Sequence, residues 1–488
     1  MNDAPLRYQR RAERPGPILL RTKIFQGLGS IPGGIKDYAF RTFLLLYYNQ
    51  VLGLTASSAS LVLLVALVFD AVSDPIVGSY SDNLRHRLGR RHPLMYAAVL
   101  PLTFSIFFLF APPQWAMDHL LWWLGFFAIA TRLSLTLFAV PWNALYAEMS
   151  EDYQERSELI SYRFAVVWVA GLVFTFSTFA FIFTASEDHP QGQLNPDLYA
   201  DFALMLAIVV GLGAFLTTYL TRDQIPYLKH PTAESPTFGL TTLLSDVGAA
   251  MQNREFSILF FAVLASAVVS GTSLALEIYM TTYFWGFGGE QLRWMSLAIT
   301  GGLLAFLTVL PLQNLFDKKY LLISCSIAIA LVSMFPVTLK LMGLAPPAGS
   351  AGLVALVVGT QAAVSYFVTI VIIMFASMVA DTLDLQELET GNRQEGLFNS
   401  VITFSSKATS GAGLLMAGLI IDLVVQLPES AQSHQVTDDI RLRLAVMDAY
   451  VVPLFNVVWL LLVARYGITR ESYAGIRDAL DLRRKGSS

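Results

Sequence analysis

Residues 57–81 read SSASLVLLVALVFDAVSDPIVGSYS, an apolar run whose ionisable side chains are Asp70 and Asp74. A helix needs about 20 mostly apolar residues to cross the hydrocarbon core of a bilayer, and this run is long enough. Similar runs recur along the chain. They predict an all-α membrane protein with twelve spanning helices, near residues 26–50, 57–81, 93–112, 118–147, 160–184, 200–220, 254–285, 292–313, 319–343, 350–381, 398–427 and 446–467.

The composition of the whole chain also favours a protein that is surrounded by lipid. Of 488 residues, 55% are hydrophobic and 14% are charged, and the mean hydropathy is +0.56. Soluble domains carry about 25% charged residues, so this chain has too few charges to cover itself in water. The net charge of −4 gives no reason to expect nucleic acid as a partner.

Lysine and arginine residues predict the orientation. They gather before the first helix and after the second, fourth, sixth and eighth, whereas the connections at 51–56, 113–117 and 185–199 have none. The connection at 428–445, with Arg441 and Arg443, is an exception. Under the positive-inside rule both termini face the cytoplasm. The predicted parts are a cytoplasmic tail at 1–25, a six-helix bundle at 26–220, a cytoplasmic loop at 221–253, a second bundle at 254–467 and a tail at 468–488.

The most informative residues are ionisable groups inside apolar runs. Each costs roughly 2.5–3.5 kcal/mol at a helix centre and therefore needs a partner or water. Asp70 and Asp74 are four residues apart and share a helix face, where two carboxylates repel unless a cation lies between them or one is protonated. The pair therefore indicates either a cation site or a shared proton. For Asp74 the alternatives are that it caps a helix break before Pro75 or that it pairs with a basic loop.

Other polar residues in the runs are candidates for substrate contact. In the first helix Asp37 and Arg41, four apart, can pair on one face. In the eleventh helix Lys407 lies about ten residues inside its run, and we expect its partner among the carboxylates of the second helix. Aromatic side chains could stack on a sugar ring or anchor the membrane interface. The substrate candidates are Asp37, Arg41, Arg132, Trp142, Asn143, Tyr146 and Glu277.

The combination of motifs resembles the glycoside-pentoside-hexuronide cation symporters of the major facilitator superfamily, and the match runs along the whole chain. The motifs are Gly27-Leu28-Gly29, Asp70-x-x-x-Asp74-Pro75 with Gly78, Gly89-Arg90-Arg91-His92-Pro93, Val140-Pro141-Trp142-Asn143-Ala144-Leu145 with Glu148 and Glu155-Arg156, and Asp381-x-x-Asp384-x-x-Glu387 leading to Gly391-x-Arg393-x-Glu395-Gly396 and Lys407.

This resemblance implies roles for particular residues. Asp70 and Asp74 match the sodium-binding carboxylates, Thr136 the hydroxyl that joins them, and Lys407 the lysine beside that site. It also implies two six-helix bundles around a cavity that opens to each side in turn, with protons or lithium replacing sodium in some members. Further loop residues match a cytoplasmic gate of ion pairs: Asp82, Arg90, Arg91, Glu148, Arg156, Arg163, Asp384 and Arg393.

The sequence departs from the family at the sugar site. Ala139 stands where the melibiose permease has an aspartate, Asn143 stands where it has a tryptophan, and its acidic ligand in the first helix falls at Gly34. We therefore expect either another glycoside, bound through Asp37, Arg41 and Arg132, or a substrate that is not a sugar. Lysophospholipid symporters of the same branch keep the helix-two carboxylates and the lysine.

The resulting prediction is a sodium-coupled symporter for a sugar or glycoside that works by alternating access. The alternatives are a sodium-dependent lysophospholipid transporter, a proton-coupled symporter and a membrane sensor. An enzyme is not expected, because the loops are short, no nucleotide-binding glycine loop occurs and the six histidines lack metal-ligand spacing. No cofactor is expected beyond the coupling ion. The predicted setting is a bacterial inner membrane, with the chain functioning as a monomer among lipids.

Overall fold

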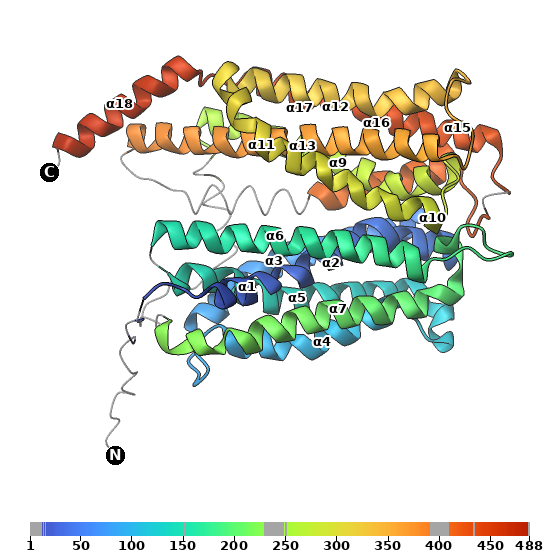
Figure 1. Ribbon diagram of the computed structural model, residues 1–488, viewed down its shortest axis with the longest axis horizontal. Coiled ribbons are helices and arrows are strands. Elements are labelled where there is room, and N and C mark those ends of the chain that lie inside the picture. The colour runs from blue at the N-terminus through green and yellow to red at the C-terminus, as the bar shows by residue number, and fades with distance from the viewer. Residues whose placement is uncertain are drawn as a thin grey trace. The chain divides into compact units, whose positions relative to one another are not determined.

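A computed structural model describes residues 12, 14, 16–150, 152–228, 248, 251–390, 409–432 and 435–486. All regular structure in these ranges is helical, with no strand (Figure 1). Helices satisfy their backbone N–H and C=O groups within one segment, which a chain in hydrocarbon requires. The all-α prediction is therefore confirmed.

The first predicted spanning helix is divided into short pieces. Helix α1 covers Leu20–Leu28 and α2 covers Ser30–Ala39, and π-helical stretches follow at Phe40–Leu44 and Tyr47–Val51. Gly29 separates α1 from α2, and a Cβ atom there would lie 2.0 Å from Nε1 of Trp142. The glycine thus lets the backbone approach an indole ring. Stretches of π-helix within helices often lie at functional sites.

Ten longer helical stretches are apolar enough to cross a membrane within the described part of the chain. A shorter apolar helix covers Thr409–Val425, and α18 (Arg470–Gly486) follows the last span. The helices of the ten stretches are α3 (Ala56–Asn83), α4 (His92–Phe110), α5 (Leu120–Met149), α6 (Tyr153–Ser177), α7 (Tyr199–Leu220), α9 (Arg254–Tyr279), α10 (Gly289–Leu292) with α11 (Ile299–Leu315), α12 (Lys318–Leu341), α13 (Ala351–Thr390), and α15 (Asp438–Val446) with α16 (Val452–Leu454) and α17 (Asn456–Ala464).

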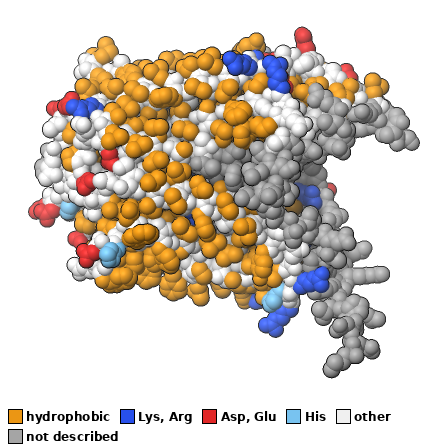
Figure 2. All heavy atoms as spheres, turned by 180° about the vertical axis from the view of Figure 1, so that it is seen from behind, with side chains coloured by type: hydrophobic (Ala, Val, Ile, Leu, Met, Phe, Trp, Pro, Cys, Tyr) orange, Lys and Arg blue, Asp and Glu red, His pale blue; other side chains and the backbone are white. Residues whose placement is uncertain are grey.

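Large apolar side chains remain exposed along these helices. Trp122 is 81% exposed, Leu307 77% and Phe126 67%. Figure 2 shows hydrophobic side chains spread over one face of the protein. Exposed apolar surface of this extent is unfavourable in water and favourable against lipid. The surface therefore agrees with a multi-pass integral membrane protein.

The chain forms two compact units. The first comprises Met1–Tyr47, Val65–Phe174 and Pro196–Gly239. Within it α4 packs against α5 and α7, and α2 packs against α7. Thr217 at the end of α7 donates a hydrogen bond of 2.6 Å to the carbonyl of Phe25 in α1. This bond fixes the interrupted first helix against α7.

The second unit comprises Tyr48–Leu64, Thr175–Asn195 and Leu240–Ser488. In it α13 packs against α11 and α12, and α9 packs against α17. The segment Tyr48–Leu64, from the first half of the chain, has specific contacts within this unit. The carboxylate of Asp422 accepts hydrogen bonds from the N–H groups of Ala56 (3.1 Å) and Ser57 (2.7 Å) at the start of α3. A carboxylate at a helix N-terminus satisfies otherwise unpaired donors and complements the helix dipole.

Candidate functional site

The first candidate site joins α3 and α5 in the first unit. The hydroxyl of Thr136 lies 2.9 Å from an oxygen of Asp70 and 2.9 Å from an oxygen of Asp74. Thr136 and Asp70 are buried. The four-residue spacing puts both carboxylates on one face of α3, and α5 brings the hydroxyl to that face. The structure thus brings together three of the four residues predicted to bind a cation.

The two contacts of Thr136 have a chemical consequence. A threonine hydroxyl carries one proton, which Thr136 shares between two carboxylates, and its oxygen keeps two lone pairs that can face a cation. The hydroxyl and the two carboxylates thus bring oxygen atoms of three side chains close together. Pro75, next to Asp74 inside α3, lacks the N–H that would otherwise donate to the carbonyl of Ala71. An oxygen-rich site of this kind suits a hard cation.

A group of basic side chains lies beside these carboxylates. Arg132 of α5 is buried, and its Nη1 lies 3.5 Å from an oxygen of Asp70. Lys36 of α2 is buried and contacts the carboxylate of Asp37 at 2.5 Å. The side chain of Arg41 donates a hydrogen bond of 3.2 Å to the backbone carbonyl of Asp37. Four-residue spacing therefore brings Arg41 to the Asp37 backbone, while the Asp37 carboxylate contacts Lys36.

The predicted aromatic contacts form a second cluster on α5 and α6. The guanidinium of Arg163 lies 3.6 Å from the ring centroid of Trp142 and 5.1 Å from that of Tyr146. Arg163 also donates a hydrogen bond to the side-chain oxygen of Asn143. The indole N–H of Trp142 donates to the carbonyl of Gln26 at 2.9 Å. Arg163, which the resemblance assigns to the gate, thus contacts three predicted substrate residues.

The other gate residues of the first half gather around Glu148. Its carboxylate lies 2.9 Å from Nη2 of Arg90 and 2.7 Å from Nη2 of Arg91. Arg91 also pairs with Asp82 at 2.6 Å and donates to the hydroxyl of Ser81 at 2.9 Å. Glu148 and Arg91 are buried, so these are not ordinary solvated loop charges. The cluster connects the end of α3, the start of α4 and the end of α5.

Arg156 has a different partner set. Its guanidinium donates to the backbone carbonyls of Ser150 (2.7 Å) and Ala147 (3.0 Å). The last carbonyls of a helix have no partner within it, so an arginine there satisfies them and complements the negative end of the helix dipole. Arg156 thus terminates α5 beside the gate cluster.

A related cluster in the second unit includes residues that the sequence reasoning did not select. Lys318 contacts both carboxylate oxygens of Asp381, at 2.8 and 2.6 Å, and the hydroxyl of Tyr473 in α18 donates to Asp384 at 2.7 Å. Burial and the bond to Asp384 raise the pKa of Tyr473 to about 12, so it stays a donor at neutral pH. The motif Asp381-x-x-Asp384-x-x-Glu387 was the signal in the sequence, and it gave the carboxylates without their partners Lys318 and Tyr473.

The remaining predicted residues lie in the second unit or outside the residues that the structure describes. Glu277 of α9 accepts a hydrogen bond of 3.2 Å from the amide of Gln361 in α13, both in the second unit. Lys407 and Arg393 lie outside the described residues. Among the residues that the structure describes, no group of three or more His, Cys, Asp or Glu side chains is arranged to hold a metal ion.

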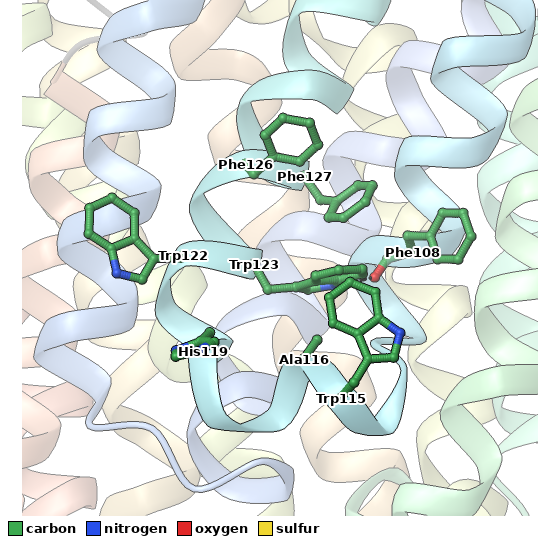
Figure 3. A pocket seen from close by; sticks show the side chains of 8 residues that line it. All are labelled: Phe108, Trp115, Ala116, His119, Trp122, Trp123, Phe126 and Phe127. Atoms are coloured by element: carbon green, nitrogen blue, oxygen red, sulfur yellow. Dashed lines mark hydrogen bonds between the residues drawn. The ribbon is translucent and has the colours of Figure 1, made fainter.

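A hollow of about 450 Å³ lies away from this chemistry, at the end of α4 and the start of α5. Figure 3 shows that aromatic side chains dominate its lining, and none of the predicted site residues lines it. Its Trp123 donates a hydrogen bond to the carbonyl of Phe108. Aromatic side chains gather in this way where helices meet the membrane interface.

Comparisons with known proteins identify the family. The family described as "MFS/sugar transport protein" matches residues 25–470. The glucuronide carrier protein homolog of Escherichia coli K12 is 23% identical, over 95% of this chain and 96% of that protein. A sphingosine-1-phosphate transporter of Xenopus tropicalis is 23% identical, over 98% of this chain and 94% of that protein. The crystal structure of a D-xylose-proton symporter aligns with a TM-score of 0.60 at 14% identity, covering 92% of this chain and 98% of that one.

The structural alignment supports the major facilitator fold, and the family match covers most of the chain. The motif resemblance, the apolar helices and the sequence relatives agree with both. The chain therefore belongs to the MFS/sugar transport protein family and is a membrane transporter of the major facilitator superfamily, not an enzyme.

Proposed function

We propose that the protein is a sodium-coupled symporter for a sugar or glycoside. The observation that carries the proposal is the Thr136 hydroxyl at 2.9 Å from both Asp70 and Asp74. A bound Na⁺ removes the repulsion between the carboxylates and lets the hydroxyl oxygen act as a further ligand. Lys407, outside the described residues, completes the proposed set. A proton or Li⁺ at the same carboxylates is the alternative coupling ion.

In this proposal sodium binding and substrate binding are coupled, because the ion site lies beside the residues that are candidates for substrate contact. Sodium and substrate each stabilise the same arrangement of α3 and α5, so each raises the affinity for the other by the same factor. The proposed bundles at 26–220 and 254–467 then alternate between openings to the two sides of the membrane. The clusters around Glu148 and Asp381 act as ion-pair latches on the cytoplasmic side. We place both termini in the cytoplasm of a bacterial cell, with the monomer in the inner membrane.

The test is thermal unfolding of the purified protein in sodium chloride or choline chloride at equal ionic strength. A ligand that binds only the folded state stabilises it by about 2.7 kcal/mol at a hundred times its dissociation constant. We expect sodium to raise the melting temperature of the wild type and of Asp118→Asn, an exposed aspartate in the connection before α5. Asp70→Asn should fold and lose the sodium effect. A sodium effect of wild-type size in Asp70→Asn would refute the assignment.

Uptake into vesicles separates transport from sensing. A symporter accumulates its substrate when a sodium gradient is imposed, whereas a sensor binds without accumulation. Asp70→Asn should lose the sodium-stimulated part of uptake. The control Asp118→Asn should take up substrate as the wild type does. Stimulation by a proton gradient, with no response to sodium, would assign the carboxylate pair to proton coupling.

A lipid substrate is the second candidate, because one relative is named as a sphingosine-1-phosphate transporter. This second function uses the same cation site, and the transported molecule has an acyl chain in place of a glycoside. Competition of uptake by a lysophospholipid, with no competition by free sugars, would favour it over the sugar proposal.

A further inference from the structure

The aromatic hollow at the end of α4 and the start of α5 takes no part in the proposed ion and substrate chemistry. Its volume is about 450 Å³, and aromatic side chains form most of its lining (Figure 3). Binding sites for small molecules commonly measure about 300–1,000 Å³ and are lined mainly by apolar and aromatic side chains. The size and the lining of the hollow therefore fit a ligand with an apolar part.

The hollow lies at the edge of the hydrocarbon core. Helix α4 has 19 residues and is about 28 Å long at 1.5 Å per residue, close to the roughly 30 Å thickness of that core. Phe108 lies in the last turn of α4, and Trp122 lies in the first turn of α5. On this spanning helix Trp122 is 81% exposed and Phe126 is 67% exposed. The lining is thus open to membrane lipid.

Part of the lining is held in place by contacts within the protein. The indole N–H of Trp123 donates a hydrogen bond of 2.8 Å to the backbone carbonyl of Phe108. The ring centroid of Trp123 lies 5.1 Å from that of Trp115 and 4.4 Å from that of Phe127. Figure 3 shows the ring of Trp122 apart from these three. Side chains that are already ordered lose little conformational entropy when a ligand binds.

Two tryptophans of the lining retain hydrogen-bond donors. An indole N–H is a donor only. Trp115 is 73% exposed, and within the described part of the chain neither its N–H nor that of Trp122 makes a hydrogen bond, in contrast to Trp123. Tryptophan is favoured at membrane interfaces because one part of its ring is apolar and the N–H is polar. A ligand that complements both tryptophans carries acceptor atoms next to its apolar part.

The charge of the lining restricts the ligand further. Apart from His119, the side chains that line the hollow have no ionisable group. The lining thus offers neither a lysine or arginine for a phosphate nor a carboxylate for an ammonium group. Uncharged acceptors match it better. The ester carbonyls of a glycerophospholipid are such acceptors, and they lie where its acyl chains enter the hydrocarbon core.

We propose that the aromatic hollow binds one glycerophospholipid, with an acyl chain against the aromatic side chains and ester carbonyls accepting hydrogen bonds from Trp115 and Trp122. This inference goes beyond the proposed symport function and does not depend on it. The bound lipid contacts the end of α4 and the start of α5 together, so it stabilises their packing. It makes no contact with the candidate cation site.

The test is native mass spectrometry of the full-length, delipidated protein, which counts the lipid molecules that stay bound as the collision energy rises. The probes are dioleoyl phosphatidylglycerol, dioleoyl phosphatidylethanolamine, and a phosphatidylglycerol whose chains are ether-linked and therefore lack ester carbonyls. We expect one molecule of either ester lipid to be retained with similar affinity. The ether lipid should bind roughly two- to tenfold more weakly for each hydrogen bond that is lost.

Variants then assign the contacts. Trp115→Phe and Trp122→Phe keep a ring and remove the N–H, so each should weaken binding of the ester lipids and leave that of the ether lipid unchanged. Trp294→Phe, 43% exposed in the second unit, is the matched control. Phe126→Ala removes part of the lining and should weaken binding of all three lipids, whereas Phe335→Ala, 52% exposed in α12, should not. Sodium should still raise the melting temperature of every variant.

Several results would overturn the inference. Equal retention of the ester and ether lipids would do so, as would wild-type retention in both Trp115→Phe and Trp122→Phe. Equal losses in the variants and their controls would mean that lipid covers the whole apolar surface without a site at the hollow. A preference for phosphatidylethanolamine would assign the rings to its ammonium group and contradict the carbonyl contacts. Retention of no lipid would refute the site, whereas loss of the sodium effect in the wild type would count only against the proposed function.

Discussion

Replacement of Thr136 by valine tests the chemistry of the candidate cation site most directly. Valine has nearly the same shape, so the change removes the hydroxyl that contacts Asp70 and Asp74 and keeps the packing of α5. A hydrogen bond or ligand contact to a charged group contributes about 1.5–3 kcal/mol. Since each 1.4 kcal/mol is a factor of ten, sodium affinity should fall by roughly 10-fold to 150-fold.

The assay is a sodium titration of the melting temperature, with choline chloride keeping the ionic strength constant. Thr136→Ser keeps the hydroxyl and should stay close to the wild type. Thr131→Val is the matched control on the same helix. Thr131 is fully buried, and its hydroxyl has no hydrogen-bond partner among the described residues. Its replacement should leave sodium affinity within about twofold of the wild type, since the removed hydroxyl makes no bond.

The refuting result is specific. If folded Thr136→Val binds sodium within about twofold of the wild type, the hydroxyl is not a ligand of the cation, and the proposed site of three oxygen-bearing side chains is wrong. If Thr131→Val loses as much affinity as Thr136→Val, the effect is general to α5 and the assignment is equally wrong.

Two further predictions concern the packing and the gate. Gly29→Ala should destabilise the protein by about 1–3 kcal/mol, because the new methyl group would lie 2.0 Å from Nε1 of Trp142. Gly33→Ala should be neutral or stabilising, because nothing lies within 4 Å of the new methyl group. Thermal unfolding of the two variants measures the difference. Glu148→Gln should cost about 3–5 kcal/mol, because it removes the buried carboxylate that contacts two largely buried guanidinium groups and leaves them only the more exposed Asp82. Asp82→Asn should cost less than about 1 kcal/mol, because its side chain is 43% exposed. An equal effect of the two members of either pair would contradict the packing described here.

The sequence by itself determined that the protein spans a membrane, that it is helical, and where the carboxylate pair lies. The length of an apolar run and its charge content are local properties, and they decide whether a segment crosses a membrane. The helical repeat is local as well, so the spacing of Asp70 and Asp74 was enough to put them on one face. The motifs around them were enough to indicate the transporter family.

The partners of these groups depended on the tertiary structure. The sequence pointed to a pair between Asp37 and Arg41, but the carboxylate of Asp37 contacts Lys36, its neighbour in the chain. Which of two nearby cations a carboxylate contacts depends on side-chain direction and on the surrounding packing, which spacing does not specify.

Contacts between distant segments were likewise beyond the sequence. The hydrogen bonds from the start of α3 to Asp422, and those from Lys318 to Asp381, join residues far apart in the chain. Periodicity describes one helix at a time, and only the packed structure decides which faces of different helices meet. For this protein, local physics determined that charges stand inside the membrane, and tertiary packing decided which of them are paired and which retain capacity for a ligand.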